Sequence, residues 1–396
     1  MKRLIVCLDG TWQTLEQTNI TNIAIIARSI THAEQRPGQD TIQQIVIYSQ
    51  GVGATTDALA RTSLMGKASR DLTRLAGGAF GEGLEDMLLD TYVRLAFNYE
   101  PGDEIYVFGF SRGAFIARSL VGLIDAVGIV SRRFVDLAWE GFRIYRARPR
   151  EGAAQEEFEA HAREAREFRR QYGKGRRDAQ GARIQSDDAP PITYMGIFDT
   201  VGQRGAPGVS WLSKLVNRRY GFHNLKPCAN VMAARHAVAI DECRLGFPPT
   251  LWTDLDEANA RVGRKAFEQR WFVGMHGDVG GGVGSPLSAT PLRWVVEGAQ
   301  AMGLKLYDTE ESPYLQAMKQ AGLSFDSAIK RPGLLKSLSP MNIPLRTRRI
   351  WSKRQAPSEA DAEDNFHPSV AYRVALQNLR PRYRPPPIRP FRKALQ

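Results

Sequence analysis

The stretch from Ile105 to Ala114 contains a G-x-S-x-G motif, Gly109 to Gly113, between a predicted strand and a predicted helix. Its first apolar residues predict a buried strand, and apolar residues with helical spacing follow as far as Val127. The turn between these elements is so sharp that only small residues fit beside the serine, which the two glycines satisfy. Because this context separates a nucleophile elbow from a chance match, we predict that Ser111 is a nucleophile.

Apolar runs elsewhere in the chain predict the sheet that would carry this turn. These runs are continuous rather than alternating, and helical patterns lie between them at 22–29 and 85–98. We therefore predict an α/β fold of the α/β-hydrolase type, with a doubly wound, mainly parallel sheet and helical insertions. The predicted strands are Leu4 to Leu8, Ile45 to Tyr48, Ile105 to Phe108, Tyr194 to Phe198 and Trp271 to Met275.

The domain organisation follows from where this pattern continues and where it ends. Residues 1–303 are predicted to form the hydrolase core. Within it, residues 142–188 carry many alternating Arg and Glu residues, which indicates inserted helices that form either a cap over the site or a solvated insertion. Residues 304–396 are predicted to be an extension that packs on the core and ends in an Arg/Pro-rich tail.

Composition and termini bear on the compartment. No window approaches the roughly 18 uninterrupted apolar residues of a membrane span. The run from Leu4 to Leu8 is too short for a signal peptide, and three cysteines do not make a disulfide framework. We therefore expect a cytoplasmic protein, and leave open export by a route that needs no cleavable signal.

The net charge bears on partners. The chain holds 54 basic and 42 acidic residues, a net charge of +12. Such an excess suits anionic partners, including peripheral contact with an anionic membrane. Because it is spread along the chain, a solvated basic surface is favoured over nucleic-acid binding. The sequence indicates no oligomeric state.

A serine nucleophile needs a general base, which is itself oriented by a third group. In α/β-hydrolases the order along the chain is serine, acid and histidine, each after a strand. Asp199 follows the run that ends at Phe198, and His276 follows the run that ends at Met275. We therefore predict His276 as the base and Asp199 as its acid partner.

Other residues compete for these roles. His236 is placed on a predicted helix as a packed or hydrogen-bonding residue, and His367 remains a rival base near the C-terminus. The remaining histidines have polar or irregular surroundings: His32, His161 and His223. Asp278, two residues after His276, is the alternative acid, or else a side chain that orders a glycine-rich loop. No metal site is predicted, since no third ligand for His276 and Asp278 is evident, and no cofactor is predicted.

The oxyanion of an acyl transfer needs preorganised N–H donors. One predicted donor is the amide of Arg112, directly after the nucleophile. The second is predicted from the loop after the first strand, at Gly10 or Thr11. Alternatively, Asp9 and Gly10 only form a tight turn.

Several longer motifs now resemble a known family. They span the chain in the order Val6 to Trp12, Gln50 to Gly53, Gly102 to Ala114, Phe198 to Gly202, His236 to Glu242, Trp271 to Gly282 and Phe366 to Val370. Together they resemble the α/β-hydrolase family that includes the first class of type VI secretion phospholipase effectors. The resemblance implies a serine hydrolase with Ser111 in the elbow and, in some members, cleavage of phospholipid acyl esters.

Three functions therefore stand side by side. The first is hydrolysis of lipid-like, including phospholipid, carboxylic esters through an acyl-enzyme. The second is a catalytically silent protein that binds an acidic surface or partner through its basic face. The third is a phosphatase with Asp9 as nucleophile, although Cys7 occupies the position that the nucleophile of such enzymes takes.

Overall fold

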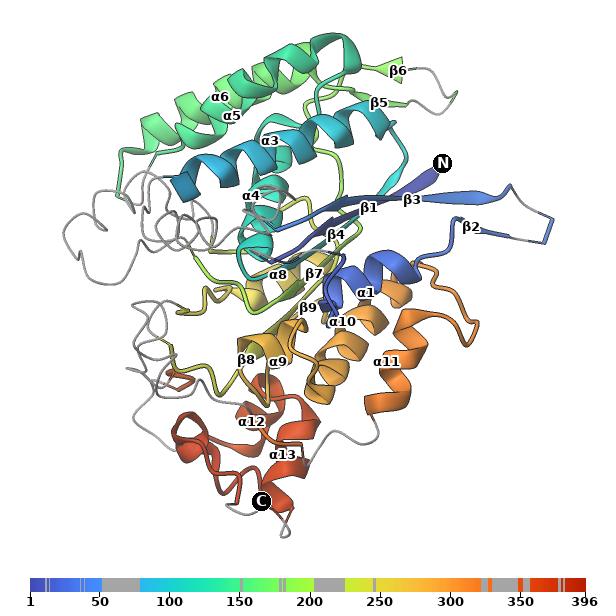
Figure 1. Ribbon diagram of the computed structural model, residues 1–396. Helices are drawn as coiled ribbons and strands as arrows, with labels where there is room; N and C mark the ends of the chain where they lie inside the picture. The colour runs from blue at the N-terminus through green and yellow to red at the C-terminus, as the bar shows by residue number, and fades with distance from the viewer. Residues whose placement is uncertain are drawn as a thin grey trace, which may run out of the picture.

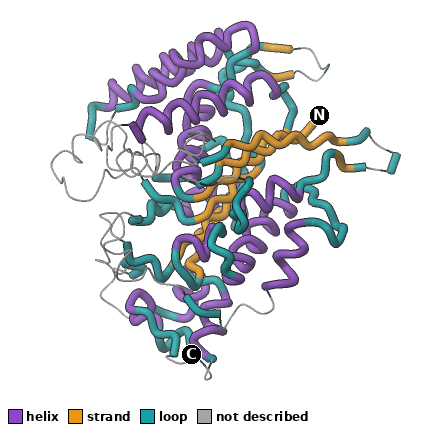
Figure 2. The backbone as a smooth tube through the Cα atoms, in the orientation of Figure 1, coloured by secondary structure: helices purple, strands orange, loops and turns teal. Residues whose placement is uncertain are grey.

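The computed structural model describes residues 1–10, 13, 15–35, 37–38, 40–51, 79–149, 152–177, 180, 183–202, 225–244, 247–321, 327–329, 348–351, 357–376, 379 and 382–396. Within these ranges one seven-stranded sheet has the order β2-β3-β1-β4-β7-β8-β9 (Figures 1 and 2). Neighbouring strands are parallel except β2 and β3. The strands are β1 (Lys2–Leu8), β2 (Ala33–Glu34), β3 (Ile42–Ser49), β4 (Glu104–Phe110), β7 (Tyr194–Phe198), β8 (Ala234–Ala239) and β9 (Phe267–Phe272).

The central strands are buried at almost every position, as continuous apolar runs require when helices cover both faces. In Figure 1, α3 and α4 lie on one face of the sheet, with α5 and α6 stacked outside them, and α1, α10 and α11 lie on the other face. The predicted mainly parallel α/β fold is confirmed. These helices are α1 (Asn22–Ser29), α3 (Ala79–Asn98), α4 (Arg112–Val127), α5 (Ala138–Arg146), α6 (Gln155–Tyr172), α10 (Ala289–Ala301) and α11 (Pro313–Ala321).

Two sequence predictions in this sheet were wrong. The segment around His236 is not a helix but strand β8, paired with β7 and β9. Its sequence, ARHAVA, is rich in helix formers, and burial between two strands overrides that local preference. Strand β9 ends at Phe272 rather than Met275, so His276 does not end a strand but opens the short helix α9 (His276–Gly280).

The order of the strands reverses beside β1, which creates a topological switch point at the carboxyl edge of the sheet. The chain passes from β1 to β3 on one side, and then crosses to β4 on the other side of β1. The loops after β1 and β4 therefore diverge, which is where sheets of this class bind ligands. Asp9 and Gly10 follow β1 there, and Ser111 follows β4.

The segment 142–188 includes most of α5, the whole of α6 and a small hairpin of β5 (Arg176–Arg177) and β6 (Arg183–Ile184). Helix α6 packs along α4 and α5, with Ala165 and Phe168 buried. Its remaining side chains are largely charged and exposed.

The C-terminal residues pack beside β9. They contribute α12 (Glu359–Asn365), α13 (Pro368–Ala375) and a final segment to a second hydrophobic cluster that also contains Trp271. Phe391 is fully buried there, and the Tyr383 hydroxyl donates a hydrogen bond to Asp241 at 2.8 Å. Within the described ranges, no helix combines the length and apolar character needed to cross a bilayer.

Candidate active site

Ser111 lies at the junction of β4 and α4 in a backbone conformation that non-glycine residues rarely adopt, with φ of 57° and ψ of −121°. The flanking glycines allow this turn. A Cβ at Gly113 would overlap the Leu8 carbonyl oxygen, and one at Gly109 would lie 2.7 Å from the Cα of Ala114. Since both obstacles are backbone atoms, they cannot move aside. The turn thus places the Ser111 side chain at the N-terminus of α4, as in a nucleophile elbow.

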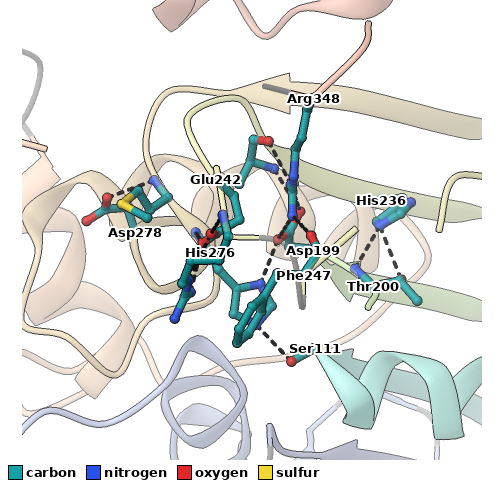
Figure 3. A network of polar contacts seen from close by, with 12 residues as sticks. Ser111, Asp199, Thr200, His236, Glu242, Phe247, His276, Asp278 and Arg348 are labelled. Atoms are coloured by element: carbon teal, nitrogen blue, oxygen red, sulfur yellow. Dashed lines mark hydrogen bonds and ion pairs between the residues drawn. The ribbon is translucent and has the colours of Figure 1, made fainter. Parts of the chain in front are cut away.

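The imidazole of His276 lies against this serine (Figure 3). Its Nε2 is 2.8 Å from Ser111 Oγ. Two rings pack against it, Phe110 at 4.6 Å and Phe247 at 5.0 Å between centroids. The backbone N–H of His276 donates to Glu242 at 3.2 Å, which ties the start of α9 to the loop after β8. His276 is thus fixed at both its backbone and its ring.

Asp199 lies on the other side of the imidazole. Its Oδ2 is 2.6 Å from Nδ1 of His276, and its Oδ1 accepts a hydrogen bond from the Ala239 amide at 3.0 Å. Like Ser111, it has a positive φ, of 38°, at the end of its strand. Its side chain is completely buried. Three side chains that lie far apart in the sequence therefore form one chain of hydrogen bonds.

A fourth residue contacts Asp199, and the sequence offered no signal for it. Arg348 donates from Nη1 to Oδ1 at 2.5 Å and from Nη2 to Oδ2 at 2.9 Å. The same two nitrogens also donate to the carbonyl oxygens of Ala239 and Phe247, at 2.7 and 2.8 Å. Such a bidentate pair is both stronger and more directional than a single ionic contact. Arg348 stands in an arginine-rich stretch without periodicity, which gave no reason to select it.

The surroundings set the protonation states of this group. Burial favours the neutral form of Asp199, but Arg348 and His276 outweigh it and hold the pKa of this carboxyl below its ordinary value. Burial also lowers the pKa of His276, against the opposing effect of Asp199. The imidazole is therefore neutral at neutral pH, which is the form that can accept a proton.

The alternative acid, Asp278, has a different position. It lies in α9, where its Oδ2 accepts a hydrogen bond from the Met275 amide at 2.8 Å. In Figure 3 its carboxylate lies apart from Ser111 and Asp199. This contact is of the loop-ordering kind that the sequence left open.

Two of the three residues predicted for the oxyanion site, Arg112 and Gly10, lie in the described part of the chain. Arg112 is the first residue of α4, so its amide lies at the helix N-terminus. The Gly10 amide donates to Oδ1 of Asp9 at 2.7 Å. Thr11 lies outside the described residues.

Asp9 is held in place by its neighbours. Besides the Gly10 amide, its carboxylate accepts hydrogen bonds from the Thr21 and Tyr48 hydroxyls, each at 2.7 Å. It is 1% exposed, and burial raises its pKa in spite of these three donors. These contacts fix the start of the loop after β1 at the carboxyl edge of the sheet.

The other histidines lie elsewhere. His236, whose pKa burial lowers to about 3, bonds to Gln269 on β9 and to Thr200 in the loop after β7. His367 caps α13 and stacks on Phe272 at 4.7 Å. Of the remaining histidines, His161 contacts the Ile144 carbonyl and His32 packs on Tyr307, while His223 lies outside the described residues. In the part of the chain that the structure describes, no group of three or more His, Cys, Asp or Glu residues is placed to hold a metal ion.

Comparison with known proteins gives the family. A family model described as "T6SS, Phospholipase effector Tle1-like, catalytic domain" matches residues 2–298. The uncharacterized protein YEL023C of Saccharomyces cerevisiae is 28% identical over 268 residues, which cover 64% of this chain and 33% of that protein.

Two solved structures are also similar, each with 17% sequence identity. One is an uncharacterized protein from Pseudomonas aeruginosa, with a TM-score of 0.37 over 83% of this chain and 51% of that one. The other is the Tle1 effector bound to the VgrG spike of the type VI secretion system, with a TM-score of 0.34 over 72% of this chain and 52% of that one. The chain thus spans 33% of the curated relative and about half of each solved chain. Since the family model matches well over half of its length, the chain belongs to the family of Tle1-like type VI secretion phospholipase effectors.

Proposed function

We propose that the protein hydrolyses the carboxylic ester bonds of lipids through an acyl-enzyme, with phospholipids as the substrate class. The observation that carries this proposal is the hydrogen-bonded sequence from Ser111 Oγ through His276 to Asp199. Membership in the phospholipase effector family supports a lipid ester as the substrate. The excess of basic residues suits a substrate that is presented at an anionic membrane surface.

The proposed reaction has two halves. In the first, Nε2 of His276 takes the proton from Ser111 Oγ as this oxygen attacks the acyl carbonyl carbon. The tetrahedral intermediate then collapses, and the leaving alcohol takes that proton from His276, which leaves the acyl group on Ser111. In the second half, His276 deprotonates a water that attacks the acyl-enzyme, and the carboxylic acid leaves as Ser111 regains its proton. Asp199 holds Nδ1 of His276 and stabilises the imidazolium in both halves.

The negative charge of each tetrahedral intermediate requires N–H donors. We propose the Arg112 amide as one donor, because it lies at the N-terminus of α4 directly after Ser111. The loop after β1, with Gly10 and Thr11, would supply the second. For Gly10 to do so, its amide must exchange its hydrogen bond to Asp9 for one to the substrate.

The phosphatase alternative has less support. A nucleophilic aspartate must present a free carboxylate oxygen to the substrate. Asp9 is 1% exposed, and its two carboxylate oxygens accept hydrogen bonds from Gly10, Thr21 and Tyr48.

A substrate panel tests the proposal. We expect hydrolysis of p-nitrophenyl esters and release of fatty acid from phospholipid vesicles, both absent in Ser111→Ala. Phosphatase activity on p-nitrophenyl phosphate that survives Ser111→Ala and disappears in Asp9→Asn would support the alternative instead. A folded wild-type protein that is inactive on every ester would contradict the proposal.

The low pKa of His276 predicts the pH dependence. Activity requires the neutral imidazole, and burial favours that form. The midpoint of the acid limb of kcat/KM is therefore expected below pH 6.5, the ordinary pKa of histidine, and kcat/KM at pH 6.5 is expected to exceed half of its maximum. The measurement is kcat/KM for a soluble ester from pH 4 to 9, and an acid limb above pH 6.5 would contradict the assignment.

A further inference from the structure

The proposed triad is held by a residue from far along the chain. Arg348 is 149 residues from Asp199 in sequence and lies beyond the matched family domain at 2–298. Its side chain is 4% exposed, and that of Asp199 is completely buried. No element of the sheet supplies a second cation to this carboxylate among the contacts of the described residues. The ion pair of Arg348 and Asp199 can stabilise the fold alone, or it can also set the geometry of the reaction.

The geometry of the ion pair favours a role in the reaction. The Asp199 carboxylate has two oxygens, and Arg348 binds both of them. The remaining contacts differ, since Oδ1 faces the Ala239 amide and Oδ2 faces His276. Rotation of the carboxylate away from His276 would therefore break both hydrogen bonds from the guanidinium as well as the hydrogen bond from the Ala239 amide. Arg348 itself cannot follow such a rotation, because the Ala239 and Phe247 carbonyl oxygens hold the same nitrogens.

The chain next to Arg348 packs against the C-terminal residues. Three residues after Arg348, the ring of Trp351 packs edge-on against Phe391 at 5.2 Å between centroids. Phe391 belongs to the second hydrophobic cluster, which also contains Trp271 of β9 and Phe366. Residues on the C-terminal side of Arg348 and strand β9 thus share one apolar cluster, and Arg348 extends from this part of the chain to Asp199.

We propose that Arg348 is a positioning residue that fixes the Asp199 carboxylate toward Nδ1 of His276, so that the C-terminal segment completes the active site. This inference rests on the proposed function. It assigns to residues beyond 298 a part of the site that the matched domain does not contain.

The proposal has an electrostatic consequence with a definite sign. The positive charge of Arg348 offsets the negative charge of Asp199. This limits how far the carboxylate stabilises the imidazolium form of His276. The other charged or titratable groups that interact with Asp199 or His276 are His236, Glu242 and Arg244. Asp278, on α9 itself, instead accepts its hydrogen bond from the Met275 amide. None of these groups is removed when Arg348 is replaced. Loss of the guanidinium therefore raises the pKa of His276, or lets Asp199 itself bind a proton, and both changes move the acid limb of kcat/KM to higher pH.

The test uses the full chain in four forms, namely wild type, Arg348→Met, Arg348→Lys and Arg349→Met. Arg349 is the neighbouring residue, is exposed and provides the same change of charge. For a soluble ester, we expect Arg348→Met to lower kcat about 10–100-fold, the range that loss of a partner of a ligating side chain produces at metal sites. Its acid limb is expected to move to higher pH, while Arg349→Met keeps the wild-type profile.

Arg348→Lys separates positioning from stability, because it retains a buried positive charge if Arg348→Met fails to fold. The lysine ammonium lacks the planar pair of donors that binds both carboxylate oxygens, so kcat is expected to fall severalfold. KM is expected to stay unchanged, and the acid limb is expected to lie near that of wild type. Circular dichroism and thermal unfolding establish the folded fraction of each variant. Loss of activity only in proportion to the unfolded fraction, or a folded Arg348 variant with the wild-type kcat and acid limb, would overturn the inference. Wild-type protein without hydrolysis that depends on Ser111 would instead overturn the proposed function together with it.

Discussion

Replacement of Ser111 with alanine is expected to lower kcat for ester hydrolysis by about 10⁴-fold or more. The substitution removes the Oγ that lies 2.8 Å from His276 and leaves no other hydroxyl at the elbow. Alanine has the same backbone demands as serine at a φ of 57°, so the strain of the turn is unchanged. The fold should therefore survive while the reaction is lost.

A serine on the same helix provides the control. Ser119 is buried two turns further along α4, about 12 Å from Ser111 along the helix axis. Ser119→Ala is expected to keep kcat within about twofold, since its hydroxyl has no part in the hydrogen bonds of Ser111, His276 and Asp199. The measurement is initial rates on a soluble ester at matched folded concentrations. Comparable rates for Ser111→Ala and wild type would mean that another group carries out the reaction.

Replacement of Asp199 with asparagine is expected to lower kcat by about 10⁴-fold, because the amide favours the wrong tautomer of His276. Asparagine is nearly isosteric, and it tolerates the positive φ at this position better than most residues. The variant also leaves Arg348 without its carboxylate, so some loss of stability should accompany the loss of activity.

The matched comparison is Asp278→Asn, which makes the same chemical change two residues from the proposed base. Its amide oxygen can still accept the hydrogen bond from Met275, and a loss of less than about tenfold is expected. Rates of both variants on one ester decide between the two acids. A larger loss in Asp278→Asn than in Asp199→Asn would reverse the assignment.

The sequence predicted most of the sheet because its strands are buried on both faces. Continuous apolar runs identify β1, β4 and β7 without knowledge of their partners. Strand β8 was missed, because alanines and a histidine do not form such a run, and its extended conformation is imposed by β7 and β9. Local preference is informative where packing agrees with it, and packing decides where the two disagree.

The same reasoning explains which site residues could be found. Ser111 has a local signature in its glycines, and the parallel sheet predicts that residues after different strands meet at one edge. Asp199 and His276 could be proposed on that basis, and the structure brings both to Ser111. Arg348 has neither a local motif nor a place after a strand. Only the fold of the C-terminal segment brings it to Asp199, so no pattern in the sequence indicated it.

The central claim is that Ser111 is an activated nucleophile, and covalent labelling tests it most directly. Wild-type protein is incubated with a fluorophosphonate at neutral pH, and the adduct is located by intact and peptide mass spectrometry. We expect one adduct, on Ser111, formed much more slowly in Asp199→Asn and absent in Ser111→Ala. Folded wild-type protein that remains unlabelled, or an adduct located on another residue, would contradict the account.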